Sequence, residues 1–189
     1  MKHNLAIFVS GSGTNCENII RYFNNNEEVN IKVVISNRSD AYALVRATNL
    51  GVRNIVVTRK QFEEMPDYVM AQVADCDYII LAGFLLKVPD YLIEAYPNRI
   101  INLHPALLPK YGGKGMYGHH VHEAVKTAGE KETGITIHYV NSEIDGGAII
   151  EQFKTALSSS DTIEDIEQKI HVLEQENFPQ VIERVLKAN

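Results

Sequence analysis

Short apolar runs separated by helix-forming segments recur along the first hundred residues. Residues 5–9 are apolar throughout, which is typical of a parallel strand buried on both faces of a sheet. Three similar runs follow, at residues 31–35, 55–57 and 78–82. Segments with helical spacing or helix-capping residues lie between the runs, at 16–23, 40–50 and 66–73. The alternation predicts an α/β fold with a parallel sheet.

Capping residues set the expected limits of two of these helices. Asp40 is the expected N-cap of the helix at 40–50, and Gly51 ends it because glycine readily adopts the left-handed conformation found there. Pro66 is tolerated in the first turn of the helix at 66–73. We therefore expect compact strand–helix units with short connections.

The second half of the chain changes character. Residues 99–104 form a fifth apolar strand, and the glycine-rich residues 109–118 predict a loop before a short helix at 122–128. Residues 135–140 alternate like a half-exposed strand, and 148–157 continue as another, so the late strands can be antiparallel. Asp161 is the expected cap of a terminal helix that reaches about residue 186. Nothing in this pattern marks a linker, so one domain over residues 1–189 is expected.

Composition excludes several classes of protein. The 189 residues can bury a full core, and a net charge of −6 without a basic run does not favour a nucleic-acid partner. Cys16 and Cys76 suggest neither a disulfide scaffold nor a zinc site. No apolar run has the length of a membrane span and no signal peptide is visible, so the cytoplasm is the expected compartment.

The end of the fifth strand carries two notable polar residues. Asn102 and His104 lie two positions apart, so on a strand they project from the same face. Pro105 stops the strand directly after them, which puts both side chains at the carboxyl edge of the sheet, where open α/β sheets bind ligands. An amide donor beside a titratable imidazole there indicates a catalytic or binding site.

Residues 10–15, Ser-Gly-Ser-Gly-Thr-Asn, join the first strand to the first helix. No lysine follows Gly13 as a P-loop requires, and Cys16 stands where a dinucleotide-binding fingerprint needs a third small glycine. The backbone N–H groups and hydroxyls of the loop suit a terminal phosphate monoester. A tight turn capped by Thr14 or Asn15 explains the same residues equally well, and spacing does not separate the two.

Asp145, Gly146 and Gly147 lie between the last two strands. Two glycines mark either a turn or the close approach of a ligand, and taken alone a turn is favoured. Beside His104, the Asp145 carboxylate would hold the imidazole in one tautomer and stabilise its protonated form. A histidine placed in this way can give or take a proton near neutral pH.

The other candidates carry less weight. The three histidines at 119, 120 and 122 crowd one segment, but no acidic or cysteine ligand stands near them at a familiar spacing, so no metal site is expected. His138 alternates along its strand and is interpreted as a surface or packing residue. Glu174 is assigned by pattern to the solvated face of the terminal helix.

Four motifs together resemble those of the folate-dependent formyltransferases, in the same order and over essentially the whole chain. They are GSGTN at 11–15, LAGF at 81–84, NLHPALLPKY at 102–111 and DGG at 145–147. The resemblance is closest to the branch that formylates glycinamide ribonucleotide in purine synthesis. It implies a single Rossmann-like formyltransferase domain, with a mostly parallel seven-stranded sheet flanked by helices.

The resemblance also implies an activity, the transfer of the formyl group of 10-formyltetrahydrofolate, as co-substrate, to the amine of 5′-phosphoribosylglycinamide in IMP synthesis. The amine would attack directly, through an oxyanion stabilised by Asn102 and protonated His104, with Asp145 orienting His104. No Ser or Cys adjoins His104, so a covalent intermediate is not required. The implied partners are these two small molecules, with no metal, nucleic acid or membrane, and the implied state is a monomer or weak homodimer.

Binding residues are carried over by position. The residues implied for the ribonucleotide are Gly13, Thr14 and Asn15 at its phosphate and Glu174 at its ribose hydroxyls. The residues implied for the folate are Leu85, Leu86, Lys87, Val88, Asn102, Asn141 and Ile144. The family's tight bend at Leu108–Pro109 favours a cis bond there.

Two stretches depart from the family. Met65 stands where an arginine that contacts the folate tail is often found, so the contacts to the tail are not assigned. The glycine-rich residues 112–119 are longer than the corresponding family loop and are interpreted as a mobile flap near the substrates, with Lys114 meeting an anionic group.

Two alternative functions stay open. One is another formyl-folate enzyme, either a hydrolase or a transferase with a different acceptor, against which the phosphate-type loop argues. The other is a non-catalytic nucleotide or folate sensor, against which the presence of Asn102, His104 and Asp145 together argues.

Overall fold

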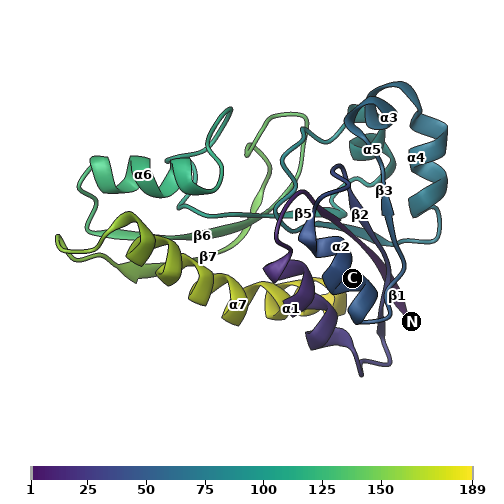
Figure 1. Ribbon diagram of the computed structural model, residues 1–189, viewed down its shortest axis with the longest axis horizontal. Coiled ribbons are helices and arrows are strands. Elements are labelled where there is room, and N and C mark those ends of the chain that lie inside the picture. The colour runs from purple at the N-terminus through teal and green to yellow at the C-terminus, as the bar shows by residue number, and fades with distance from the viewer. Residues whose placement is uncertain (1, 189) are drawn as a thin grey trace. The chain divides into compact units, whose positions relative to one another are not determined.

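The strands in the described part of the chain, residues 2–188, form one seven-stranded sheet in the order β3-β2-β1-β4-β5-β6-β7 in the computed structural model (Figure 1). Strand β1 pairs in parallel with β2 and β4, and β2 pairs in parallel with β3. Strands β6 and β7 are antiparallel. The expected α/β class, with a mostly parallel seven-stranded sheet flanked by helices, is confirmed.

Strands and helices alternate along most of the chain. The strands are β1 (His3–Val9), β2 (Val29–Ser36), β3 (Asn54–Val56), β4 (Tyr78–Leu81), β5 (Ile100–His104), β6 (Glu132–Tyr139) and β7 (Ile149–Ala156). The helices are α1 (Thr14–Phe23), α2 (Tyr42–Asn49), α3 (Arg59–Glu64), α4 (Pro66–Val73), α5 (Asp90–Ala95), α6 (His119–Thr127) and α7 (Ile163–Ala188).

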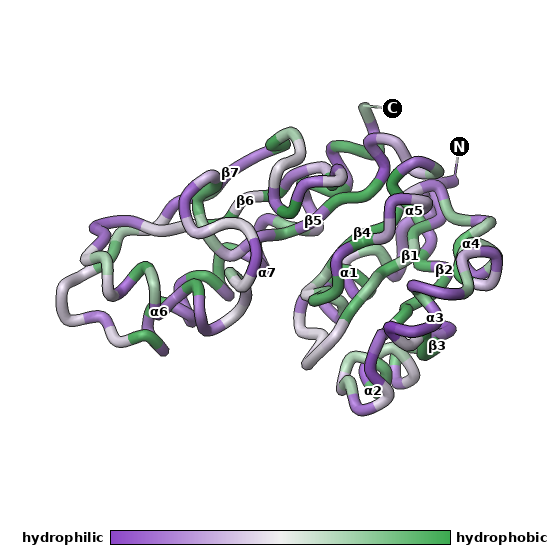
Figure 2. The backbone as a smooth tube through the Cα atoms, turned by 90° about the horizontal axis from the view of Figure 1, so that it is seen from above, coloured by the Kyte–Doolittle hydropathy of each residue, from purple (hydrophilic) through white to green (hydrophobic). Residues whose placement is uncertain are grey.

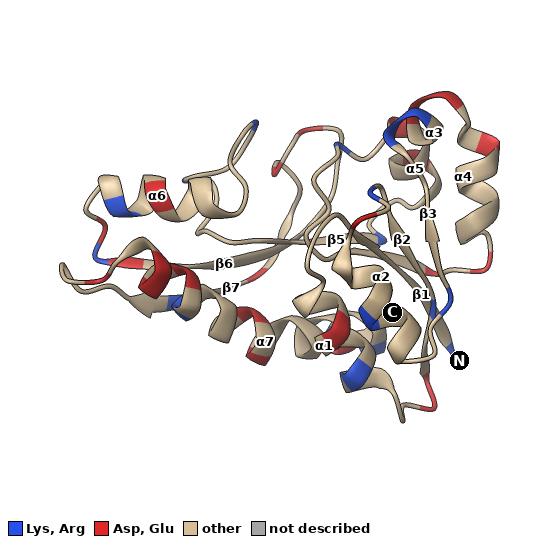
Figure 3. Cartoon of the chain, viewed as in Figure 1, with Lys and Arg blue, Asp and Glu red and all other residues tan. Residues whose placement is uncertain are grey.

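The chain divides into two compact units, residues 1–101 and 102–189, and the boundary falls within β5. The expectation of a single domain over residues 1–189 stays a prediction. Within residues 2–188, no helix combines the length and the apolar character that crossing a membrane requires. Lys and Arg are scattered over the helices and loops of both units (Figure 3).

Apolar strands form the core of the first unit. Every residue of the run Leu5 to Val9 in β1 is fully buried, and so are Ile79 and Ile80 of β4. Figure 2 shows the hydrophobic colour along both strands. Helix α1 packs against α2 and β2, and α2 packs against β2 and β3. Burying these runs on both faces stabilises the unit through the area that they remove from water.

Helix α7 organises the second unit by packing against β6, β7 and α6. Its buried residues recur at helical spacing, among them Ile166, Ile170, Phe178 and Ile182. Strand β6 is buried along most of its length, from Thr133 to His138. The expectation of a half-exposed strand there is therefore wrong, because α7 covers β6 and the segment after β5 also bonds to it through Thr136.

Two short helices, α3 and α5, are absent from the predicted elements. Helix α3 forms because Thr58 and Gln61 make a capping box, in which each side chain accepts a hydrogen bond from the other residue's backbone N–H. Phe62 of α3 is buried with its ring 5.7 Å from that of Phe8. A short helix of this kind depends on such packing more than on its own hydrogen bonds.

Three predicted helix limits differ from the structure. Asp40 is not the cap of α2: Ala41 holds that position, and the Asp40 carboxylate accepts two hydrogen bonds from Arg38. The N–H of Asp165 donates to the Thr162 hydroxyl at the start of α7, whereas the Asp161 carboxylate accepts from Lys169. Helix α6 begins at His119, three residues before the predicted start. In the first two cases, the carboxylate that was expected to cap the helix binds a basic side chain.

Candidate active site

Strand β5 carries Asn102 and His104 to the start of a turn held by β6. Ile100 and Ile101 are fully buried and fix the strand. The Thr136 hydroxyl, on β6, accepts from the N–H of Leu108 at 3.0 Å and donates to the carbonyl of Ala106 at 2.7 Å. The Leu108–Pro109 bond is cis, as expected.

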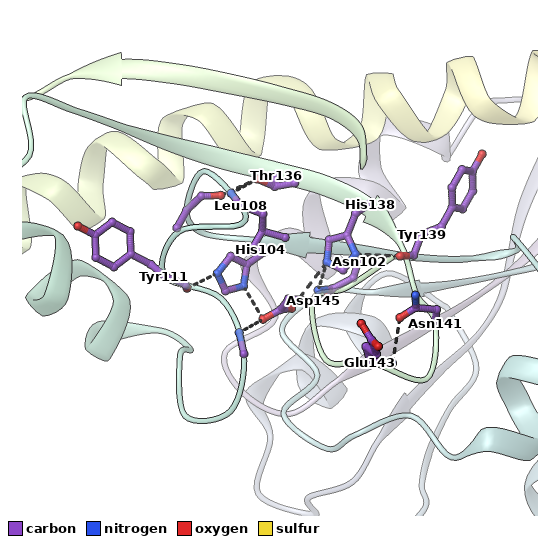
Figure 4. A network of polar contacts seen from close by, with 12 residues as sticks. Asn102, His104, Leu108, Tyr111, Thr136, His138, Tyr139, Asn141, Glu143 and Asp145 are labelled. Carbon is purple, nitrogen blue, oxygen red and sulfur yellow. Dashed lines mark hydrogen bonds and ion pairs between the residues drawn. The ribbon is translucent and has the colours of Figure 1, made fainter. Parts of the chain in front are cut away.

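Both ring nitrogens of His104 face acceptors, and the side chain is almost fully buried (Figure 4). Nε2 lies 2.7 Å from the backbone carbonyl oxygen of Tyr111, and Nδ1 lies 3.5 Å from Oδ2 of Asp145. A carbonyl oxygen can only accept, so Nε2 carries a proton. The Asp145 carboxylate faces Nδ1 on the other side of the ring, and together the two acceptors hold the imidazole in one orientation.

Asp145 is held in place by the backbone of the glycine-rich loop. Its Oδ2 accepts from the N–H of Gly113 at 2.9 Å, in addition to its contact with His104. Asp145 and Tyr111 both have a φ of 56°, a left-handed conformation that costs a non-glycine residue about 1–2 kcal/mol. The two residues that face His104 are thus both in strained backbone, as is common at functional sites.

The contact between Asp145 and His104, which the sequence could only suppose, is present. Asn102 joins the same cluster through His138, whose Nε2 lies 3.0 Å from Asn102 Nδ2 and 3.7 Å from Asp145 Oδ1. The cluster therefore comprises Asn102, His104, His138 and Asp145 (Figure 4).

His138 corrects a sequence-based interpretation. It is 2% exposed and takes part in this polar cluster, so it is not a surface residue or a mere packing residue. Burial lowers the pKa of His138, although Asp145 and a backbone hydrogen bond act in the opposite direction. Only the pairing of β5 with β6 could have identified the residue, because nothing in the chain near His138 marks it.

The cluster combines three chemical capacities. The Asn102 amide can donate a hydrogen bond to an oxygen that gains negative charge, a term that is often the largest in such sites. His104 can donate a proton from Nε2, and Asp145 can hold the imidazole in the orientation that this requires. These capacities suit addition to a carbonyl group.

The glycine loop, residues 10–15, was a candidate for phosphate binding, and some of its residues also have structural roles. Gly13 has a φ of 78°, and a Cβ there would lie 2.4 Å from the Cβ of Ala43, so glycine is needed for α1 to approach α2. The Ser10 hydroxyl donates to Asn37 and accepts from the N–H of Leu85, so it is engaged within the protein. No side chain caps the start of α1, at Thr14, which keeps the helix N-terminus suited to an anion.

The residues expected at the folate divide between the two units. The residues of the first unit are Leu85, Leu86, Lys87 and Val88, and those of the second are Asn102, Asn141 and Ile144. Leu85 and Ile144 are about half exposed, at 52% and 49%, whereas Val88 is buried. The side-chain Oδ1 of Asn141 accepts from the N–H of Glu143 and shapes the turn before Asp145.

Glu174 is buried at 6% exposure, so its pattern-based assignment to a solvated face is wrong. Its carboxylate lies 3.2 Å from Nδ1 of His171, one turn earlier on α7, and this hydrogen bond raises the pKa of His171. His122 of α6 is also buried, and its Nδ1 has no partner. Burial lowers the pKa of His122.

Other candidate groups are inert or dispersed. Both cysteines are buried and unpaired, and burial raises the pKa of Cys16 to about 12 and that of Cys76 to about 11. Thiols with such pKa values stay protonated near neutral pH. Within residues 2–188, no group of His, Cys, Asp or Glu side chains is arranged to hold a metal ion.

Comparisons with known proteins point to one family. A family profile described as formyl transferase matches residues 3–182. Phosphoribosylglycinamide formyltransferase of Haemophilus influenzae is 37% identical over 184 residues, which are 94% of this chain and 84% of that protein. The Bacillus subtilis protein of the same name is 33% identical over 190 residues, 97% of this chain and 95% of that protein.

A solved structure extends the similarity to the fold. The crystal structure of phosphoribosylglycinamide formyltransferase from Bacillus halodurans matches with a TM-score of 0.89 at 32% identity. The match covers 98% of this chain and 97% of that chain.

Proposed function

We propose that this chain, which belongs to the formyl transferase family, transfers the formyl group of 10-formyltetrahydrofolate to the amine of 5′-phosphoribosylglycinamide. The observation that carries the proposal is the cluster of Asn102, His104 and Asp145, whose chemistry suits addition to a carbonyl group. The names of the similar proteins from Haemophilus influenzae and Bacillus subtilis support the choice of acceptor.

The reaction needs no covalent enzyme intermediate. The amine nitrogen bonds to the formyl carbon while the carbonyl electron pair moves to oxygen. The Asn102 amide N–H and the positive charge of His104 stabilise that oxyanion. When the oxyanion collapses, the bond between the formyl carbon and N10 of the folate breaks. N10 gains a proton and the amine loses one, so atoms and charge balance.

His104 must exchange a hydrogen-bond partner during this reaction. Its Nε2–H donates to the Tyr111 carbonyl at 2.7 Å. To pass that proton to the leaving nitrogen, the imidazole exchanges the carbonyl for the substrate, while Asp145 keeps Nδ1 oriented. The adjoining residues 112–118 are rich in glycine, which permits Tyr111 and the backbone after it to move.

Binding residues follow from the family resemblance and from local chemistry. Gly13, Thr14 and Asn15, at the uncapped start of α1, hold the phosphate through backbone N–H groups and the helix dipole. The carboxylate of Glu174 accepts hydrogen bonds from the ribose hydroxyls. The folate is bound by Leu85, Leu86, Lys87, Val88, Asn102, Asn141 and Ile144.

The protein acts on small molecules in the cytoplasm, without a metal or a nucleic-acid partner, as a monomer or a weak homodimer. The net charge of −6 and the scattered Lys and Arg side chains support the absence of a nucleic-acid surface (Figure 3).

The test is a turnover assay that follows folate absorbance with phosphoribosylglycinamide as acceptor. We expect release of tetrahydrofolate that depends on the acceptor and falls steeply in Asn102→Ala. Asn54→Ala, which removes a half-buried amide of β3 far from these motifs in the sequence, is the matched control and should turn over at the parent rate. Release without acceptor would indicate a hydrolase, and binding without turnover would indicate a sensor. Either result would overturn the proposal.

A further inference from the structure

The two ring nitrogens of His138 have different neighbours. Nδ1 lies 2.9 Å from the backbone carbonyl oxygen of Tyr139, and Nε2 lies 3.0 Å from Nδ2 of the Asn102 side chain (Figure 4). His138 is on β6 and Asn102 on β5, so the contact joins two strands. Both contacts have ordinary hydrogen-bond lengths.

These neighbours determine the tautomer. The Tyr139 carbonyl can only accept, so Nδ1 of His138 must carry the proton. In a neutral imidazole the other nitrogen then has a lone pair, and Nε2 accepts a hydrogen bond from the Asn102 amide nitrogen. A charged imidazole would instead set an Nε2–H against the amide N–H₂ group, and Asn102 would have to turn its oxygen toward the ring.

We propose that His138 is a positioning residue that fixes the side-chain amide of Asn102, so that the second N–H of that amide is held ready for the formyl oxygen. The inference rests on the proposed function. Without the acceptor at Nε2, the amide can rotate by half a turn and present its carbonyl oxygen to the developing oxyanion. That orientation repels the negative charge that the donor should stabilise.

The surroundings of His138 keep it neutral near pH 7. It is buried, and burial disfavours the charged form, while His104 on β5 adds a repelling charge when it is protonated. Asp145, 3.7 Å from Nε2, and the Tyr139 carbonyl favour the charged form, and burial outweighs them. The two histidines therefore take different roles beside one carboxylate, because Nε2 of His104 donates to the Tyr111 carbonyl whereas Nε2 of His138 accepts from Asn102.

A pair of substitutions separates the two nitrogens of His138. In His138→Gln, the side-chain oxygen can take the place of Nε2 and accept from Asn102. In His138→Asn, the amide can take the place of Nδ1 and donate to the Tyr139 carbonyl, but no acceptor reaches Asn102. We expect His138→Asn to lower kcat by about 10²-fold, with little change in either KM, because a misplaced catalytic group costs about that much. His138→Gln should recover most of the rate.

A double-mutant cycle tests whether His138 acts through Asn102. In an Asn102→Ala background, His138→Asn should lower kcat no further, because the amide that it orients is absent. If the losses of kcat from His138→Asn and Asn102→Ala multiply independently, the proposal is overturned. It is also overturned if His138→Asn couples to Asp145→Asn and not to Asn102→Ala. Thermal unfolding of each variant shows whether it is folded, and the kcat comparison is made on the folded variants.

Nuclear magnetic resonance supplies a readout that does not depend on turnover. With ¹⁵N labelling, we expect the proton of His138 on Nδ1, no proton on Nε2, and a scalar coupling between Asn102 Nδ2 and His138 Nε2 through their hydrogen bond. A proton on Nε2 at about pH 7 would overturn the assignment of the tautomer. If the protein shows the coupling but no formyl transfer, the proposed function fails and the hydrogen bond stands. If it transfers formyl groups but shows no coupling, the positioning role fails alone.

Discussion

Replacing Gly147 with alanine should damage the turn that carries Asp145. A Cβ built at Gly147 would lie 1.7 Å from the carbonyl oxygen of Tyr139 and 2.7 Å from its carbonyl carbon, whereas ordinary contact begins at 3.4 Å. Both atoms belong to the backbone, so no side-chain rotation can relieve the overlap. The separation must therefore double, from 1.7 to at least 3.4 Å.

This displacement reaches the polar cluster of Asn102, His104, His138 and Asp145. The Tyr139 carbonyl accepts from Nδ1 of His138 at 2.9 Å, and the Tyr139 N–H donates to the carbonyl of Ala148 at 2.9 Å. Overpacking costs about 1–3 kcal/mol, and each of these two hydrogen bonds contributes about 1 kcal/mol. We expect Gly147→Ala to lower the free energy of unfolding by about 3–5 kcal/mol.

Urea unfolding measures the effect, with the m-value as a check that the denatured state is unchanged. Gly11→Ala is the control for stability, because a Cβ at Gly11 meets nothing within 4 Å. It should change the free energy of unfolding by less than about 0.5 kcal/mol. If Gly147→Ala also stayed within that limit and kept full kcat, the turn would not need the close approach and the reasoning would be refuted.

Three further predictions concern single side chains. Asn102→Ala should lower kcat by about 10²–10³-fold, as the loss of one oxyanion donor does, and steady-state kinetics at saturating substrates would measure it. Glu174→Gln should raise the KM for phosphoribosylglycinamide by about tenfold and leave that for the folate unchanged, because a charged acceptor becomes neutral; equal changes in both KM values would contradict the ribose assignment. Burial lowers the pKa of both His122 and His138 below the ordinary value of 6.5. Below about pH 6.5 the unfolded chain therefore binds more protons at these two histidines than the folded protein does. Their contribution to stability is present above that pH and is lost below it. His122→Leu should make the free energy of unfolding fall less steeply between about pH 6.5 and 5 in urea titrations, and an unchanged slope would show that His122 does not titrate there.

Much of the fold could be predicted because the relevant signals are local. The run Leu5 to Val9 can bury itself only as an inner strand, and Pro66 and Gly51 mark helix limits that the structure has at α4 and after α2. The helices α3 and α5 are missing from the prediction because each has only six residues, too few for a periodic pattern. Their formation depends on packing partners elsewhere in the chain.

The candidate site divides in the same way. The strand end at Asn102 and His104 and the two glycines after Asp145 are visible in the sequence, and the motif resemblance joins them. The burial of Glu174 is hidden from the sequence, because it results from the packing of α7 against α6 and the sheet.

The sequence alone is enough to establish the order of the strands and the longer helices, the abrupt end of β5 and the family resemblance, because these depend on neighbouring residues and ordered motifs. Only the tertiary structure reveals the partners of His104 and the place of His138. Residues 102 and 138 meet through the packing of separate strands, and Gly113 reaches Asp145 through a folded loop. Such contacts result from pairing and burial across the whole chain, and no local pattern of residue types encodes them.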